Sequence, residues 1–412
     1  MKGPIMAIYL KYKGSLIAVL ILILLGILQI HNAFFHPITR GFDADAHIEY
    51  IKYIQNTKSL PIIFEGWQYY QAPLYYLLGV FMAQFIYLKF FGVCLYFLLL
   101  ILAYKLYKNQ FRKANQNFLI LGVLFIATLP VLLYQSISIG NEFLSMVLIS
   151  LALIFYHMKK INTVKTALAL GVLLGLAIAV KATAFVLVAG IFLDFIISHK
   201  DFIAKIKSFG LVLYAMIGIG GMHYITNFIY YGKLLAAPDN FPQYFSFLQP
   251  VSPRNFEFFT TMKGFFTMDL FQSHHYSFLS GTYFSWFYDG HNIVVPVQEF
   301  SKAGTMLIFM SFPIFFLMVF GFIQTVKHLN IHNRIFILYT VLLFGSYILY
   351  NFHLPYFSTV KGSFIASLAL PAGYFFLKGF DRFQKYSGVV SLYFLIYSLI
   401  LVKHFWILDW WY

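Results

Sequence analysis

LIAVLILILLGILQI, residues 16–30, is a run of fifteen residues without a charged side chain. Comparable apolar runs recur to the end of the chain. A bilayer core of roughly 30 Å needs about 20 such residues per helix, and its backbone groups must be satisfied internally because no water is present. The runs are continuous rather than alternating every second residue, which favours helices over a barrel. The sequence therefore predicts an all-α polytopic membrane protein.

Composition supports this class. Of 412 residues, 61% are hydrophobic and only 10% are charged, and the mean hydropathy is +0.77. Soluble proteins carry about 25% charged residues, so the two or three soluble domains that length alone suggests are excluded. We expect a single transmembrane domain over residues 1–412. No small-x-small cleavage pattern follows the first run, which predicts an uncleaved span. Cys94 is the single cysteine and cannot form an intrachain disulfide.

About eleven membrane-spanning helices are expected from the apolar runs. Their predicted ranges are 14–32, 88–106, 117–137, 143–158, 165–180, 183–198, 209–229, 303–325, 335–351, 363–379 and 387–404. Most of the 29 Lys and Arg residues fall in loops on one side. By the positive-inside rule this side is cytoplasmic, with the N-terminus inside and the C-terminus outside. The net charge of +15 then reflects membrane orientation and excludes nucleic acid as a partner.

Two predicted outer segments are too long to be simple connections: residues 31–88, the first extracytoplasmic loop, and residues 230–302, the second. Loops of this length are uncommon unless they are functional. Residues 72–88 are apolar but shorter than a comfortable span, which predicts interfacial or re-entrant helix. The second segment is rich in aromatic residues and is interrupted by prolines.

The first outer segment contains a cluster of ionisable residues, Gly41-Phe42-Asp43-Ala44-Asp45-Ala46-His47-Ile48-Glu49-Tyr50. Asp43, His47 and Tyr50 are spaced i, i+4 and i+7, so on a helix they share one face. A carboxylate at the membrane surface can take a proton from an acceptor hydroxyl, and shielding from water would raise its pKa towards a useful value. The alternative is that these acids are solvated interface residues, which the clustering disfavours.

The pattern Phe-Asp-x-x-x-His-x-x-Tyr, followed by Leu60-Pro61 and Pro73-Leu74-Tyr75-Tyr76, resembles the GT-C superfamily of membrane glycosyltransferases. Within it, the sequence is most similar to the protein O-mannosyltransferase and aminoarabinose-transferase-like enzymes. Where that family has Asp-Glu, this chain has Asp43-Ala44, with a second acid at Asp45. Weaker matches follow in the same order at residues 87–92, 141–142, 175–183, 224–232, 361–364 and 370–371.

The resemblance implies a GT-C-like bundle with interfacial helices in the first outer loop. It also implies transfer of one sugar, with inversion, from a polyprenyl-phosphate-linked donor on the extracytoplasmic face, with Asp43 as the catalytic base. Fixed cations stabilise a departing phosphate best where water is excluded. The candidate substrate-binding residues are Asp45, His47, Tyr70, Gln71, Lys89, Asn141, Glu142, Lys181 and Lys361, the three lysines being assigned to the phosphate. The acceptor, which could be a protein, a lipid or a polysaccharide, stays open.

A divalent metal is also considered, because carboxylates suit hard cations and some GT-C enzymes use one whereas others do not. Its candidate ligands are Asp43, Glu142, His274 and His275. Adjacent histidines point apart in a regular helix or strand, which favours an ordinary polar loop for the last two. Each lysine could instead snorkel to the interface. Lys181 lies between apolar runs, where an ionisable residue favours function.

Two other functions remain as alternatives. A transporter or flippase of a lipid-linked glycan would also need buried charges, but the acids cluster near the outer edge and no internal repeat is seen. A GT-C protein that binds lipid without turnover is the other, which the departures at Ala44 and Val180 keep open. The compact length suggests a prokaryotic inner or plasma membrane.

Overall fold

The computed structural model describes residues 4–159, 161–197, 202–240, 243–244, 251–294 and 301–408. Within these ranges the chain is helical and forms no strand, apart from one isolated bridge between Val251 and Tyr356. The α-helices are α1 (Pro4–Phe35), α2 (Ala44–Thr57), α3 (Leu74–Phe81), α4 (Phe85–Gln110), α5 (Gln116–Ala127), α6 (Pro130–Ile137), α7 (Glu142–Met158), α8 (Val164–Val180), α9 (Ala184–Ile197), α10 (Phe202–Met216), α11 (Met222–Tyr231), α12 (Phe256–Thr260), α13 (Phe278–Phe287), α14 (Ser301–Lys327), α15 (Arg334–His353), α16 (Ala369–Phe380) and α17 (Ser387–Phe405). Between them lie one π-helical turn, η1 (Ile217–Gly221), and the 3₁₀ segments η2 (Pro238–Asn240), η3 (Ser273–His275), η4 (Phe357–Thr359), η5 (Gly362–Leu368) and η6 (Asp381–Tyr386).

The predicted helical membrane class is confirmed. In the described residues, six helical stretches are long and apolar enough to cross a bilayer, and the bent pair α5–α6 would make a seventh. Every predicted span falls largely on helix, although residues 128, 129 and 183 are not helical and residue 198 lies outside the described residues. Three of them, α7, α8 and α9, have only 17, 17 and 14 residues. The count of about eleven crossings therefore stays a prediction.

A break between α5 and α6 divides one predicted span, 117–137. The two helices meet at an angle of 56°. Leu129 is extended, with φ −70° and ψ 114°, because the proline ring of Pro130 disfavours helical backbone in the residue before it. Pro130 then opens α6, where its missing N–H costs nothing. The bend leads the chain towards Asn141 and the start of α7.

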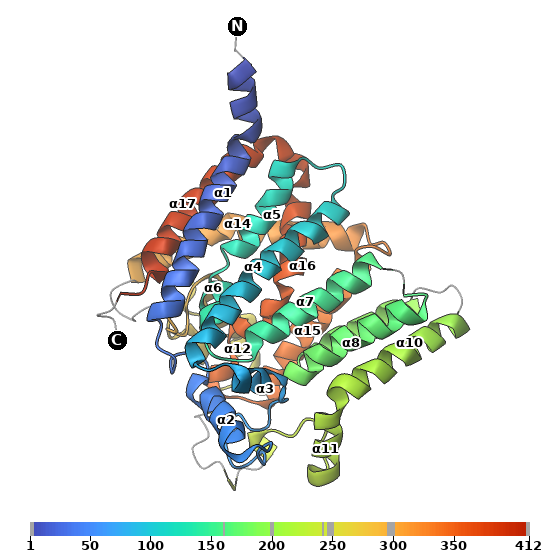
Figure 1. The fold of residues 1–412 in the computed structure, drawn as a ribbon. Coiled ribbons are helices and arrows are strands. Elements are labelled where there is room, and N and C mark those ends of the chain that lie inside the picture. The colour runs from blue at the N-terminus through green and yellow to red at the C-terminus, as the bar shows by residue number, and fades with distance from the viewer. Residues whose placement is uncertain are drawn as a thin grey trace.

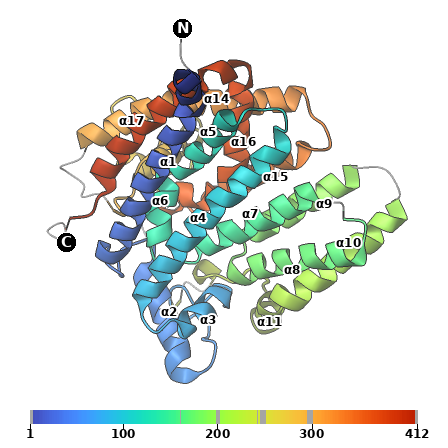
Figure 2. The same cartoon turned by 45° about the horizontal axis from the view of Figure 1, so that its top comes forward.

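The helices form one bundle, in which segments distant in sequence lie side by side. Figures 1 and 2 show α1 and α17 together along one flank, and the Nδ2 atom of Asn32 donates to the Phe405 carbonyl over 2.5 Å. α14 and α16 approach closely because glycines lie at the contact. A β-carbon at Gly321 would overlap the Phe375 carbonyl, and one at Gly379 would overlap the Leu317 carbonyl. Helix association within lipid has no hydrophobic driving force, and such small residues let the helices approach closely enough for van der Waals packing to stabilise it.

The surface of the bundle is apolar in a way that a soluble protein could not sustain. Along α10 and α11, Tyr214, Met222 and Phe228 are exposed, and Phe316 on α14 is exposed as well. Contiguous exposed apolar surface of this kind belongs in contact with lipid. The structure is therefore that of an integral membrane protein.

The first predicted outer segment carries two short helices at one end of the bundle, α2 and α3 (Figure 1). This agrees with the expected interfacial helix, although residues 85–88 already belong to α4. Of the second outer segment, the structure describes η2, α12, η3, α13 and the turns between them. Residues 241–242, 245–250 and 295–300 of that segment lie outside the described residues.

Candidate active site

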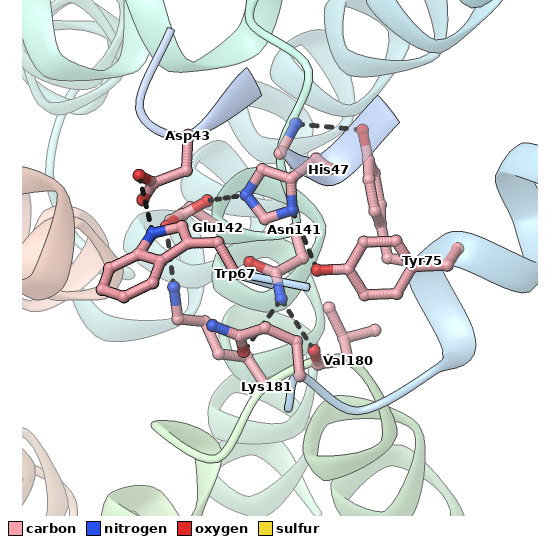
Figure 3. Close-up of polar contacts among 11 residues, drawn as sticks. Asp43, His47, Trp67, Tyr75, Asn141, Glu142, Val180 and Lys181 are labelled. Atoms are coloured by element: carbon pink, nitrogen blue, oxygen red, sulfur yellow. Dashed lines mark hydrogen bonds and ion pairs between the residues drawn. The ribbon is translucent and has the colours of Figure 1, made fainter. Parts of the chain in front are cut away.

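Asp43 lies at the N-terminus of α2 in an unusual backbone conformation. Its φ of 57° and ψ of 27° are left-handed, which a residue other than glycine adopts at a cost and which clusters at functional sites. An aspartate at this position normally accepts a hydrogen bond from the first turn, but the Asp43 carboxylate makes none. Instead its Oδ1 accepts a hydrogen bond of 3.2 Å from Nε1 of Trp67 (Figure 3). The carboxylate is thus aimed away from its own helix.

The sequence analysis expected a shielded carboxylate on the same helical face as His47 and Tyr50. That expectation is wrong for Asp43, which is exposed because α2 begins one residue later, at Ala44. His47 and Tyr50 do lie together on the buried face of α2. The Tyr50 ring stacks on Tyr76 at 3.7 Å. Asp45 is also exposed, at the first turn of α2.

His47 links α2 to the start of α7. Its Nδ1 lies 2.8 Å from the Tyr76 hydroxyl, and its Nε2 lies 4.0 Å from Oε2 of Glu142 (Figure 3). Burial lowers the pKa of His47, and the negative charges of Glu142 and Asp43 oppose this effect. The ring is therefore neutral near pH 7. Its Nδ1 ties α2 to Tyr76 of α3, whereas Nε2 faces Glu142 at a distance too long for a hydrogen bond.

Glu142 forms a buried ion pair with Lys181. Their Oε1 and Nζ atoms are 2.7 Å apart, and each side chain is only about a tenth exposed. The neighbouring Asn141 ties the same two segments to the first outer loop, since its Nδ2 donates to Oε1 of Gln71 and to the Val180 carbonyl, both at 3.2 Å. The pair lies at the start of α7 and the end of α8, which fixes Lys181 beside the Asp43 loop (Figure 3).

Lys361 is the second cation of the site and lacks such a partner. It is 5% exposed and lies over the Phe42 ring at 4.1 Å and the Phe364 ring at 4.9 Å. The Lys181 ammonium also faces Phe364, at 5.6 Å. Within the described part of the chain, no carboxylate lies within 4.0 Å of the Lys361 ammonium. A desolvated cation held by aromatic faces is ready to receive an anion.

Two other predicted residues have different surroundings. Lys89 is buried, and its ammonium donates to the carbonyl of His36, just beyond the end of α1. This contact caps the helix and lies apart from the Glu142–Lys181 pair. Tyr70 stays near the site: its carbonyl accepts from His223 at 3.1 Å. Burial, with Tyr350 and the charges of Asp43 and Glu142, raises the pKa of the Tyr70 hydroxyl well above its usual value, so it stays protonated near pH 7 and can donate a hydrogen bond.

The histidines of the second outer segment do not point apart. Because η3 is a 3₁₀ turn, the rings of His274 and His275 lie 4.2 Å apart, and His291 lies 4.2 Å from His274. Phe42 separates this cluster from Asp43, with its ring 5.2 Å from His291. The described residues contain no group of three or more His, Cys, Asp or Glu side chains arranged to hold a metal. Glu142, one of the candidate metal ligands, forms an ion pair with Lys181.

Sequence reasoning missed the aromatic partners of the charged groups. Trp67 and Phe364 belong to aromatic-rich stretches, and the interface belt explained such residues without a site. Only the folded chain shows that the Trp67 indole contacts Asp43 and that Phe364 faces both lysines.

No protein-family model matches the chain, and no curated protein matches it in sequence. Among solved structures, it is similar to the crystal structure of ArnT from Cupriavidus metallidurans bound to undecaprenyl phosphate. The TM-score is 0.51 at 11% sequence identity, over 89% of this chain and 60% of that chain. The chain has a GT-C-like fold. At this identity the likeness concerns the fold alone, and the chain spans about 60% of the length of its structural relative.

Proposed function

We propose that the protein is a membrane glycosyltransferase that moves one sugar from a polyprenyl-phosphate-linked donor to an acceptor on the extracytoplasmic face. One observation carries this proposal: an exposed carboxylate, Asp43, is turned from its helix towards a site that holds the buried cation Lys361. A base for the acceptor and a cation for a departing phosphate are the two groups that the reaction needs. The ArnT-like fold, in a relative bound to undecaprenyl phosphate, supports the choice of donor.

The proposed reaction is a single displacement. The acceptor loses its proton to the Asp43 carboxylate and attacks the anomeric carbon of the sugar. The bond between that carbon and the phosphate oxygen breaks, and the polyprenyl phosphate leaves with the electron pair. Attack from the face opposite the leaving group inverts the anomeric centre.

The two lysines have different parts in this proposal. Lys181 is already paired with Glu142 at 2.7 Å, so its positive charge is partly compensated and stabilises the leaving phosphate less. Lys361 has no such partner in the described residues and supplies the larger stabilisation. Its aromatic neighbours keep water away, which strengthens its attraction for the phosphate. Asn141, Gln71 and His47 position the carboxylate of Glu142 and the outer loop.

The test measures sugar release from radiolabelled polyprenyl-phosphate donors by the purified chain, with host membrane extract as the acceptor source. The wild type should turn over at least one donor. Asp43→Asn should reduce the rate by about 10²- to 10⁴-fold, the usual contribution of a positioned base. Glu49→Gln removes another exposed carboxylate of α2 and is the matched control, with an unchanged rate.

Equal rates in the wild type and Asp43→Asn would remove Asp43 from the mechanism. Tight binding of every donor without sugar release would favour a flippase or a lipid-binding protein instead.

A further inference from the structure

A second polar site lies at the opposite end of the bundle from Asp43. Its cavity has a volume of about 1530 Å³ and is bounded by the ends of α4, α7, α9, α10, α15 and α16. α7 connects the two sites, since Glu142 begins it at the outer site and His157 lines the cavity. At 1.5 Å per residue, these side chains are about 22 Å apart along the helix axis. The basic residues predict that this end is cytoplasmic.

The inner wall of the cavity is held by buried polar contacts. Asp194 is 4% exposed, and its Oδ1 lies 2.5 Å from Nε of Arg334. The Tyr156 hydroxyl donates to Oδ2 of Asp194 over 2.6 Å. The buried Asn333 orders the loop before α15, because its Nδ2 donates to the His328 carbonyl over 3.1 Å. α7, α9 and α15 are therefore tied together around a defined hollow.

Positive charge exceeds negative charge on the cavity lining. Both acids of the lining are matched by a cation, Asp194 by Arg334 and Asp381 by Lys378 at 3.8 Å. The remaining lining cations are Arg112, Lys113 and Lys159. Over the described ranges, none of these three lies within 4.0 Å of a carboxylate. The positive-inside rule explains the sign of these charges, but not their gathering around a hollow.

Apolar side chains share the lining with the cations. They are Phe111, Ala114, Met158, Ile161, Phe195, Ile331 and Ile335. Small-molecule pockets usually have volumes of about 300–1,000 Å³, so this cavity could hold a larger amphiphile. Basic pockets between membrane helices on the cytoplasmic side bind phosphorylated lipid headgroups.

We propose that this cavity binds the phosphate headgroup of an anionic membrane lipid. Arg112 and Lys113 contact the phosphate, and the apolar part of the lining covers the start of the acyl chains. Arg112 is oriented for this role by Asn109, whose carbonyl accepts from Nε over 3.3 Å and whose Oδ1 accepts from an η nitrogen over 3.2 Å. This site is separate from the transfer reaction proposed above and does not depend on it.

The experiment measures the Tm of the full chain in nanodiscs of phosphatidylcholine alone, with added pyrophosphate, or with part of the lipid replaced by phosphatidylglycerol. A ligand that binds only the folded state raises the Tm. The test variant is Arg112→Gln/Lys113→Gln. The control, Lys105→Gln/Lys165→Gln, removes the same charge from exposed positions of the same face that do not line the cavity. All four side chains are exposed, so both variants should fold.

Phosphatidylglycerol should raise the Tm of the wild type and of the control by several degrees, and the Arg112/Lys113 variant should lose most of that rise. Equal rises in the two double variants would overturn the proposal. A rise with pyrophosphate alone would assign the cavity to a soluble phosphate compound and would also overturn it. So would a rise that Lys361→Met abolishes and the Arg112/Lys113 variant keeps, because the ligand would then occupy the outer site.

Discussion

Each end of the bundle contains a buried ion pair, and the two pairs differ in what surrounds them. At the end far from Asp43, Asp194 is fully engaged, by Arg334 at 2.5 Å and by the Tyr156 hydroxyl at 2.6 Å. At the end that carries Asp43, predicted to be the outer one, the Glu142–Lys181 pair at 2.7 Å adjoins two groups that the described residues leave without an ion-pair partner. These are the exposed carboxylate of Asp43 and the buried ammonium of Lys361.

The difference separates an ion pair that only supports the fold from one that adjoins the proposed reactive groups. A buried ion pair whose partners satisfy each other mainly positions helices, and losing one partner destabilises the fold. An ionisable residue that is buried, or held in a strained backbone conformation, without such a partner destabilises the fold. Such residues are concentrated at functional sites. By this criterion, we assign Asp43 and Lys361 to the proposed reaction centre, and Asp194 and Arg334 to the framework.

After the loss of activity in Asp43→Asn, the largest expected effect is a loss of stability in Asp194→Asn. It leaves the Arg334 guanidinium without its carboxylate, which should lower the free energy of unfolding by about 3–5 kcal/mol. The rate of sugar transfer per folded molecule should stay the same. Denaturation in detergent micelles and transfer assays on the folded fraction measure both quantities.

Asp381→Asn is the control for this prediction. Its pair with Lys378 is longer, at 3.8 Å, and about a third exposed, so the expected loss is only about 0–1 kcal/mol. At the outer end, Glu142→Gln should lower both stability and rate. A fall in rate for Asp194→Asn as large as that for Glu142→Gln would end the distinction between the two pairs.

Two buried lysines, Lys361 and Lys89, test whether reactive and structural groups can be told apart by their contacts. Lys361→Met should slow transfer by about 10²- to 10³-fold, as for loss of one group that stabilises developing negative charge. Its Tm should not fall, because the change removes a buried cation that has no ion-pair partner in the described residues. Lys89→Met should instead lower the Tm, since the His36 carbonyl loses its donor. A slower rate for Lys89→Met than for Lys361→Met would reverse these assignments.

Trp67→Phe should have a smaller effect, limited to the rate constant of transfer. The ring is kept, but the Nε1–H that donates to Asp43 is lost. A hydrogen bond to a charged group contributes about 1.5 kcal/mol, so kcat should fall about ten-fold while KM for the donor stays unchanged. Steady-state kinetics separate the two constants. A change confined to KM or to the Tm would show that Trp67 only supports the loop.

Acid should destabilise the protein slightly through the buried histidines of the second outer segment. Burial lowers the pKa of His274 to about 2 and of His291 to about 4, from an ordinary 6.5. The unfolded chain therefore binds more protons below pH 6.5. This stability is fully present above 6.5 and is lost as pH falls towards 4, by at most about 1.4 kcal/mol per pH unit for each ring. The Tm measured between about pH 7 and pH 5 should fall less steeply in His274→Gln than in the wild type, and an equal slope would contradict this.

The sequence predicted the helices and most of the segments that meet at the outer site. Apolar runs identify buried or lipid-facing helices directly, and the motif around Asp43 and His47 drew attention to the first outer loop. Asn141 and Glu142 were expected from the resemblance to the GT-C superfamily, and Lys181 because an ionisable residue between apolar runs favours function. The geometry then brings these groups within hydrogen-bonding or ion-pair distance of one another.

Side-chain directions could not be predicted in the same way. Lys89 and Lys361 both lie beside apolar stretches, yet one turns to the end of α1 and the other lies between Phe42 and Phe364. The left-handed backbone of Asp43, with a φ of 57°, was not expected from the sequence either. The second cavity gave no sequence signal, because its lining comes from six separate helices and the loops between them, and its basic residues look like ordinary interface residues.

The most direct test of the outer site is a structure of the full chain in nanodiscs with undecaprenyl phosphate, the ligand of its structural relative. The account predicts that the phosphate lies within hydrogen-bonding distance of the Lys361 ammonium and beside the Asp43 carboxylate. A phosphate bound elsewhere, with Lys361 still enclosed by Phe42 and Phe364, would contradict it.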